Sequence, residues 1–245
     1  MSIALAAPLV GAALVSPVSR SAIKCPIAMG GRVPTKFTLQ MFDTTASPFS
    51  PNRRTGLIVG NGSDLTNTRV KTFHWSFQQD SNMKMNLTHE YTNVWHERKD
   101  YNGGQFSVNT GIILGEDKPT DSNVSKTGLD ENLWKILSNK NDVIWTTSIA
   151  WDAWQNFAVT VDYISDSGCT TLQVWYSAGG DALQAVTRPL AKDNSGGGQF
   201  QLGMAKKATE AVTVVYGGYH ESNIHEGQIY GGIFIEDSIG GCISK

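Results

Sequence analysis

Apolar and polar side chains alternate with a period of two residues through most of the chain. Such alternation is typical of half-buried β-strands, in which one face packs on the core and the other stays polar. The alternating apolar sets are Phe73, Trp75 and Phe77; Phe106, Val108 and Thr110; Phe157, Val159, Val161 and Tyr163; Leu172 and Val174; and Phe200, Leu202 and Met204. Clusters of Gly, Asn, Asp and Ser between these sets, as at 102–104 and 194–198, predict tight turns.

One segment departs from this alternation. Between Asp130 and Asn139 an apolar stripe of Leu, Trp and Ile follows an acidic start, which predicts a short helix. Many short strands and one helix favour an all-β fold: a β-jelly roll, or two-sheet antiparallel sandwich, with a concave cleft. No internal repeat or linker interrupts the pattern, so we expect residues 25–245 to form a single domain.

Composition and charge exclude several partners. The 245 residues are 40% hydrophobic and 17% charged, with a formal net charge of −2. No basic field exists to attract nucleic acid or anionic lipid. No loop rich in glycine leads from a strand into a helix, which disfavours nucleotide chemistry and its cofactors. We expect a monomer that needs no cofactor.

The first residues have the pattern of an export signal. An apolar run from Ile3 to Val15 is followed by small residues, although Arg20 and Lys24 follow the run instead of preceding it. The run is too short to span a bilayer and has the length of a signal-peptide core. We therefore predict a signal peptide over 1–24 and a secreted, extracellular protein. No later stretch reaches ~18 apolar residues, so no membrane attachment is expected.

The three cysteines suggest one covalent closure. Cys25 lies at the expected mature start and Cys242 three residues from the end, whereas Cys169 is internal. Chain termini of compact domains often lie close together, and an oxidising compartment permits a bridge, so we predict a Cys25–Cys242 disulfide. Asn61, Asn86 and Asn123 each begin an N-x-Ser/Thr sequon and are candidate glycosylation sites.

Four of the five histidines stand directly before a glutamate, in the pairs His89-Glu90, His96-Glu97, His220-Glu221 and His225-Glu226. Neighbouring strand residues point to opposite faces, so no pair can act as one unit. No pair has the HExxH spacing, and no metal site is predicted. Glu90 and Glu97 are seven residues apart, about 23 Å at ~3.3 Å per residue. Paired carboxyls of glycosidases lie ~5–9.5 Å apart, so either would need a partner from another strand, such as Glu221 or Glu226.

Aromatic and basic residues supply candidate binding groups. Trp95 lies beside polar residues near a strand end, where its ring could stack on a sugar or simply pack on the core. Lys206 and Lys207 follow the predicted strand at 199–204 and could orient a substrate or be plain surface charge.

Several segments, taken together and in order, resemble one family over about 220 residues. These are Cys25-Pro-Ile, Gly31-Arg-Val-Pro34, Ser47-Pro-Phe-Ser-Pro51, Asn86-Leu-Thr-His-Glu-Tyr91, Gln105-Phe106, Trp154 to Tyr163, and Glu226 to Phe234 with Gly241-Cys242. They are similar to the catalytic module of glycoside hydrolase family 131. The resemblance implies a fungal secreted β-glucanase with a jelly-roll fold, acting on β-1,3-, β-1,6- and β-1,4-linked glucans.

The resemblance also implies where the site lies. The functional carboxylates would fall in the segment holding Glu90 and Glu97 and in the one holding Glu226, whereas His96, His220 and His225 would be local variation. Within the matching segments we predict that His89, Tyr91, Gln105 and Tyr230 contact substrate, beside Trp95, Lys206 and Lys207.

Three functions remain open at this point. The leading hypothesis is a β-glucan hydrolase in which Glu97 or Glu90 is one catalytic carboxyl and Glu226 or Glu221 the other. A jelly-roll polysaccharide lyase would instead use His89 or Tyr91 to abstract a proton, with Lys206 and Lys207 neutralising a uronate. A non-catalytic glycan-binding wall protein would bind glucan without releasing product.

Overall fold

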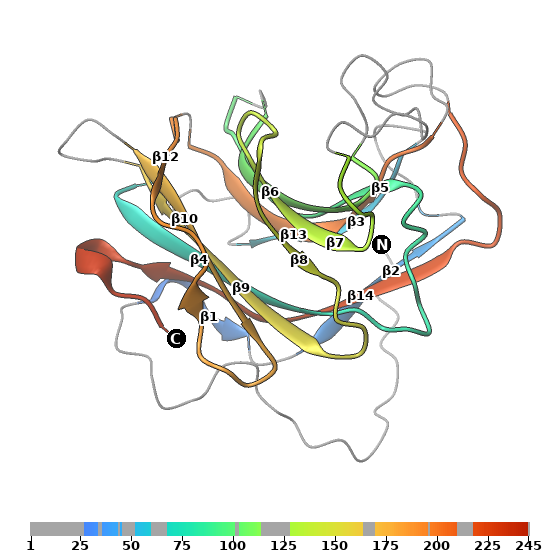
Figure 1. The fold of residues 1–245 in the computed structure, drawn as a ribbon, viewed down its shortest axis with the longest axis horizontal. Helices are drawn as coiled ribbons and strands as arrows, with labels where there is room; N and C mark the ends of the chain where they lie inside the picture. The colour runs from blue at the N-terminus through green and yellow to red at the C-terminus, as the bar shows by residue number, and fades with distance from the viewer. Residues whose placement is uncertain are drawn as a thin grey trace.

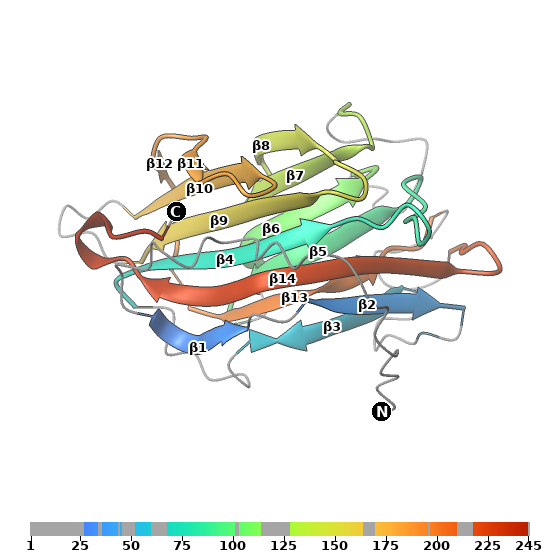
Figure 2. The ribbon, with the colours of Figure 1, turned by 90° about the horizontal axis from the view of Figure 1, so that it is seen from below.

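The computed structural model describes residues 27–33 (backbone only), 36–43, 45, 52–59, 68–100, 103–113, 128–163, 170–195, 197–209 and 218–244. Two antiparallel sheets form the layers of a sandwich (Figures 1 and 2). Within the described ranges, no helix is long and apolar enough to cross a membrane.

The larger sheet has eight strands in the order β1-β14-β4-β9-β10-β11, with β2 also pairing with β14 and β12 with β10. Its strands are β1 (Ile27–Val33), β2 (Phe37–Phe42), β4 (Val70–Gln78), β9 (Trp154–Asp162), β10 (Thr171–Ala178), β11 (Gln184–Ala185), β12 (Leu190–Ala191) and β14 (His225–Asp237).

The smaller sheet has six strands in the order β3-β13-β5-β6-β7-β8. Its strands are β3 (Arg53–Ile58), β5 (Glu90–Glu97), β6 (Gly104–Gly111), β7 (Leu133–Ser138), β8 (Val143–Ser148) and β13 (Gln199–Lys206). The all-β sandwich expected from the alternation is confirmed, and the described residues contain no α-helix; η2 (Ile239–Gly241) is a short 3-10 turn.

The core lies between the sheets and is rich in aromatic rings. Phe73, Trp75 and Phe77, the alternating positions of β4, are all buried. Trp75 stacks on Phe157 of β9 with ring centroids 5.8 Å apart, and Phe73 meets Phe200 of the opposite sheet at 5.0 Å. The apolar side of each alternating strand therefore faces this shared interior, as the pattern predicted.

The predicted helix between Asp130 and Asn139 is wrong. The segment contains strand β7, which pairs with β6 on one side and β8 on the other. Trp134 and Ile136 face the core, while Lys135 is also buried, so the run lacks the polar alternation of the other strands. Hydrogen bonds to two neighbouring strands, which the local sequence does not reveal, decide the conformation.

Several sequence predictions fall outside the described residues. The signal peptide over 1–24 and the sequons at Asn61 and Asn123 lie there. Cys25 lies there too, so the Cys25–Cys242 disulfide stays a prediction.

Candidate active site

Strand β5 carries polar groups on the face of the six-stranded sheet that points away from the core. The Glu90 side chain is only 4% exposed. It is bonded to Lys207 Nζ at 2.6 Å and to Asn109 Nδ2 at 3.0 Å. The same Asn109 amide donates to Thr92 Oγ1 at 3.2 Å, so Glu90 and Thr92 share a face. A positioned, nearly buried carboxylate on a sheet face is the kind of group that acid–base chemistry requires.

A second carboxylate cluster lies on the core side of β5. Lys206 Nζ bridges Glu221 Oε1 at 2.5 Å and Glu226 Oε1 at 2.7 Å. Glu226 also accepts hydrogen bonds from Tyr91 Oη at 2.9 Å and from the backbone N–H of Asn86 at 3.1 Å. Its side chain is 4% exposed, and all its bonds go to protein groups. Consecutive lysines therefore serve opposite faces: Lys206 this interior cluster, and Lys207 the outer carboxylate.

Glu221 is the more accessible member of this cluster, with 25% of its side chain exposed. Burial disfavours its charged form, but hydrogen bonds from Lys206 and from Asn86 Nδ2 (2.8 Å) outweigh this and lower its pKa to about 2. Glu221 is therefore ionised at neutral pH. The Asn86 amide nitrogen that glycosylation would modify is the one that bonds Glu221, and glycosylation there stays a prediction.

His89 connects the two faces. Its Nδ1 donates to the Lys207 carbonyl oxygen at 2.8 Å, and its Nε2 lies 2.9 Å from Glu221 Oε2. Its ring lies 5.3 Å from the ring of His220, centroid to centroid. Burial lowers the pKa of His89, an effect opposed by the hydrogen bond to Lys207. Burial also raises the pKa of Tyr91 well above its usual range, with a further contribution from the Glu226 charge.

Lys135 and Glu131, which sequence reasoning did not select, lie across the sheet from Glu90. The Lys135 ammonium is buried and donates to the Gly111 carbonyl at 2.9 Å. Burial lowers its pKa to about 8, while the negative charges of Asp130, Glu131 and Glu90 oppose the shift. Glu131 is exposed, and its backbone carbonyl accepts from Gly111 N at 3.1 Å. The sequence predicts a helix start at Glu131, whereas its backbone is bonded to Gly111, the residue that pairs with Glu90 in the sheet.

The other end of β5 holds a different network. Glu97 Oε2 accepts from Gln201 Nε2 at 2.6 Å, and Gln201 Oε1 accepts from Arg54 at 2.7 Å. The Arg54 guanidinium lies over the Trp95 ring, 4.7 Å from its centroid. Gly203 beneath the indole leaves room for it, since a Cβ there would lie 3.1 Å from the Trp95 ring edge. Trp95 and Glu97 thus lie on the same sheet face as Glu90, at the opposite end of the strand.

Five of the seven predicted substrate contacts are buried: His89, Tyr91 and Lys206 around the interior carboxylates, and Gln105 and Tyr230 elsewhere. Gln105 is buried and donates to the carbonyl oxygens of Ser195 (2.7 Å) and Gly197 (3.0 Å), which holds that turn against β6. Tyr230 is buried in the core and donates to the Gly203 carbonyl at 2.6 Å. Neither side chain is exposed to solvent in this conformation.

Carboxylate, amide and indole groups along one face of an antiparallel sandwich are groups suited to binding a sugar chain. The chain belongs to glycoside hydrolase family 131: the sequence model of the glycoside hydrolase 131 catalytic N-terminal domain matches residues 38–241. The family prediction made from the sequence is confirmed, and the chain is a glycoside hydrolase.

Two solved structures are similar to the fold. The GH131 β-glucanase catalytic domain from Podospora anserina has a TM-score of 0.62 at 19% identity, covering 82% of this chain and 72% of that one. The catalytic domain of the glycoside hydrolase family 131 protein from Coprinopsis cinerea has a TM-score of 0.58 at 19% identity, covering 82% and 69%. No curated protein matches the sequence.

Proposed function

We propose that this glycoside hydrolase cleaves β-glucan, and that Glu90 is one of its two catalytic carboxyls. The observation that carries the proposal is the setting of Glu90: a nearly buried carboxylate held by Lys207 and Asn109 on the polar face of the six-stranded sheet. A family 131 relative from Podospora anserina is named a β-glucanase, which supports this substrate class. The β-1,3-, β-1,6- and β-1,4-linkages expected from the sequence belong to the same proposal.

The second carboxyl that best fits this face is Glu131. It precedes β7, which follows β5 and β6 in the sheet, so the backbones at Glu90 and Glu131 are about 10 Å apart at ~4.8 Å per strand. Burial lowers the pKa of Lys135, and the negative charges of both carboxylates raise it; Lys135 is a β7 residue whose ammonium reaches the Gly111 carbonyl at the end of β6. Inverting glycosidases hold their carboxyls ~6.5–9.5 Å apart, with water between them. We therefore propose inversion, one carboxyl protonating the glycosidic oxygen and the other activating water.

Glu226 is less suited to this role, although the sequence placed it in the site. Its carboxylate is bonded to Lys206, Tyr91 and Asn86 and faces the interior of the sandwich. Its Oε1 accepts from Lys206, Tyr91 and the Asn86 backbone N–H, so protein donors occupy that oxygen, while Oε2 accepts from Tyr91 alone.

Trp95 supplies a platform for a sugar ring farther along the same face. It is five residues from Glu90, about 16 Å at ~3.3 Å per residue. A glucan chain lying along β5 would reach both groups. Indole rings stack on the apolar face of a pyranose while neighbouring polar groups, here Gln201 and Glu97, bond its hydroxyls.

Amide substitutions at the carboxyls test the proposal. We expect Glu90→Gln and Glu131→Gln each to lower kcat on laminarin or on a soluble β-1,4-glucan by about 10²- to 10⁴-fold, since each removes proton transfer. Asp142→Asn, an exposed carboxylate in the β7–β8 turn, is the matched control and should retain wild-type rates. Wild-type rates in both glutamate variants would overturn the assignment.

The same assay separates the remaining alternatives. Loss of activity in Glu97→Gln, Glu221→Gln or Glu226→Gln alone would return the site to the carboxyls chosen from the sequence. An unsaturated product from a polyuronate would indicate a lyase. Glucan affinity in calorimetry without any product would indicate a binding protein.

A further inference from the structure

His89, His220 and Glu221 bring three metal-ligating groups to one point beside the proposed active site. One donor atom from each lies within 4.8 Å of the other two. The shortest separation is 2.9 Å, between His89 Nε2 and Glu221 Oε2. The groups come from two parts of the chain, the residue before β5 and the segment that leads into β14. Their meeting is therefore a product of the fold.

The hydrogen bond at the back of His89 fixes the direction of its free lone pair. Nδ1 faces the Lys207 carbonyl oxygen at 2.8 Å, and a carbonyl cannot donate, so Nδ1 carries the hydrogen. In the neutral ring, Nε2 then presents a lone pair to Glu221 Oε2, which has only lone pairs to offer. Two acceptors at 2.9 Å repel unless a proton, which would make His89 an imidazolium, or a metal ion lies between them. A histidine anchored through its other nitrogen to a backbone carbonyl is the usual arrangement of a metal ligand.

The charge around this point also favours a cation. Glu221 and Glu226 carry two negative charges, and Lys206, which bridges their Oε1 atoms, supplies one positive charge. The cluster keeps one net negative charge. Lys206 contacts Oε1 of Glu221, which leaves Oε2, the atom facing His89, on the side away from the ammonium.

We propose that His89 Nε2, the His220 ring and Glu221 Oε2 bind one divalent transition-metal ion, with Zn²⁺ as the best fit. Two imidazoles and a carboxylate suit Zn²⁺ and its first-row neighbours, whereas Ca²⁺ and Mg²⁺ prefer oxygen ligands alone. Donors around a tetrahedral zinc are about 3.4 Å apart at bond lengths of ~2.0–2.1 Å. The His89–Glu221 pair, at 2.9 Å, would have to widen by about 0.5 Å, and the His220 donor, within 4.8 Å of both, would have to move by at most about 1.4 Å. Three protein ligands would leave the fourth position for water or substrate.

Such an ion would join the 218–224 segment to the start of β5, next to Glu90. It would therefore hold this edge of the site in place. This inference does not depend on which carboxyls perform hydrolysis, because it is tested by binding.

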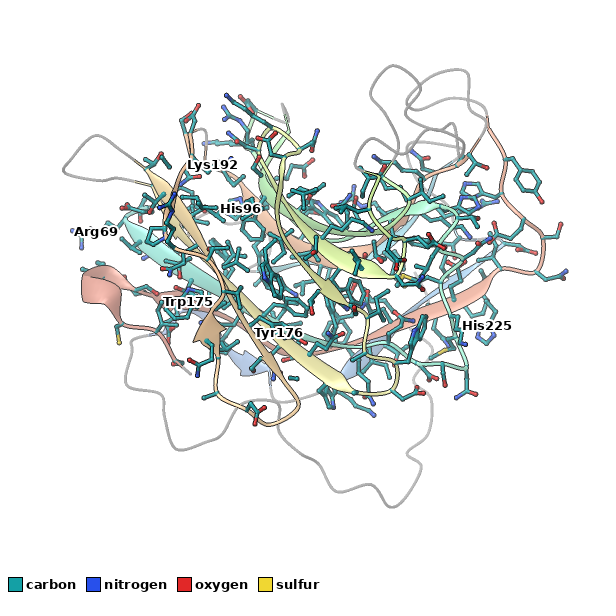
Figure 3. All side chains as sticks on the ribbon, in the orientation of Figure 1. Arg69, His96, Trp175, Tyr176, Lys192 and His225 are labelled. Atoms are coloured by element: carbon teal, nitrogen blue, oxygen red, sulfur yellow. The ribbon has the colours of Figure 1, made fainter. Side chains whose placement is uncertain are left out.

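Equilibrium dialysis with ZnCl₂ tests the site on the full chain, stripped with EDTA and carrying no affinity tag. We expect one Zn²⁺ per wild-type chain, at least tenfold weaker binding in His220→Ala, and a Zn²⁺-dependent rise in Tm that His220→Ala lacks. His225→Ala is the matched control: His225 is exposed at the start of β14 (Figure 3), stacks on Phe42 and is not one of the three cluster residues. It should bind as the wild type does.

Two further measurements keep the result decisive. Glu221→Gln keeps the shape of the third ligand but removes its charge, so it should also weaken binding at least tenfold. Co²⁺ in place of Zn²⁺ should give the visible absorption of a tetrahedral site in wild type and not in His220→Ala. No saturable Zn²⁺ binding, or equal affinity in wild type and His220→Ala, would overturn the proposal, whatever the hydrolytic activity.

Discussion

Replacing His96 with phenylalanine should remove a pH-dependent part of the stability of the sandwich. His96 is fully buried between the two sheets (Figure 3), with its ring 4.9 Å from that of Phe73 and its Nε2 2.8 Å from Tyr163 Oη. Burial in this aromatic setting lowers its pKa from 6.5 to about 4. The folded protein therefore holds the ring neutral at a pH where the unfolded chain would protonate it.

The magnitude follows from the two pKa values. A difference of 1.36 kcal/mol per pKa unit gives about 3 kcal/mol in all. Because the folded pKa is the lower one, this stability is fully present above pH 6.5. It is lost as the pH falls from 6.5 towards 4, where the folded protein also takes up the proton. The free energy of unfolding should fall by roughly 1.4 kcal/mol for each pH unit within that window.

Urea unfolding followed by tryptophan fluorescence at several pH values between 7 and 4 measures this effect. The His96→Phe variant loses the bond to Tyr163, a cost of about 1–2 kcal/mol that should not vary with pH. The gap in unfolding free energy between wild type and variant should therefore shift by about 3 kcal/mol in favour of the variant between pH 7 and pH 4. His225→Phe, which removes an exposed histidine, should show no such shift. A constant gap for His96→Phe would refute the reasoning.

Two other substitutions test the packing around the site. Lys206→Met should lower the free energy of unfolding by about 3–5 kcal/mol, because it leaves the carboxylates of Glu221 and Glu226 together without their shared cation. Lys140→Met, at an exposed lysine, is the control. A loss below about 1 kcal/mol for Lys206→Met in urea unfolding would contradict the prediction. Gly203→Ala should cost about 2 kcal/mol or more, since its Cβ would lie 2.4 Å from the Thr55 carbonyl oxygen. Gly180→Ala, with nothing within 4 Å of the added carbon, should unfold like the wild type, and equal stability of the two variants would show that β3 and β13 can separate freely.

The sequence predicted the strands well wherever one face is apolar and the other polar. The alternation of Phe157, Val159 and Val161 is reproduced in β9, whose partners β4 and β10 could not be read locally. The strand prediction failed at β7, where burial on both sides removes the alternation and leaves an apolar run with helical spacing. A pattern records which faces are buried, and it cannot distinguish a doubly covered strand from a helix.

The candidate site was likewise predicted in part from the sequence and decided in part by the fold. The sequence placed Glu90 and Glu97 on one strand and too far apart to be partners, and the structure puts them at opposite ends of β5. On a regular strand, a separation of seven residues would point the Glu90 and Glu97 side chains to opposite faces. An irregularity in the pairing with β6 between Thr92 and Val94 turns both Asn93 and Val94 inward, so that both glutamates lie on one face.

The sequence by itself therefore determined most of the strands, because alternation is a local pattern, and placed Glu90 on one of them. It also determined the family, through short segments that follow one another in order along the chain. Only the tertiary structure decided what each charge meets. It directs Lys206 to the interior carboxylates and Lys207 to Glu90, brings Glu131 across two strand widths, and gathers His89, His220 and Glu221 at one point. These meetings depend on strand order and register, which long-range hydrogen bonds and burial determine together and no local pattern encodes.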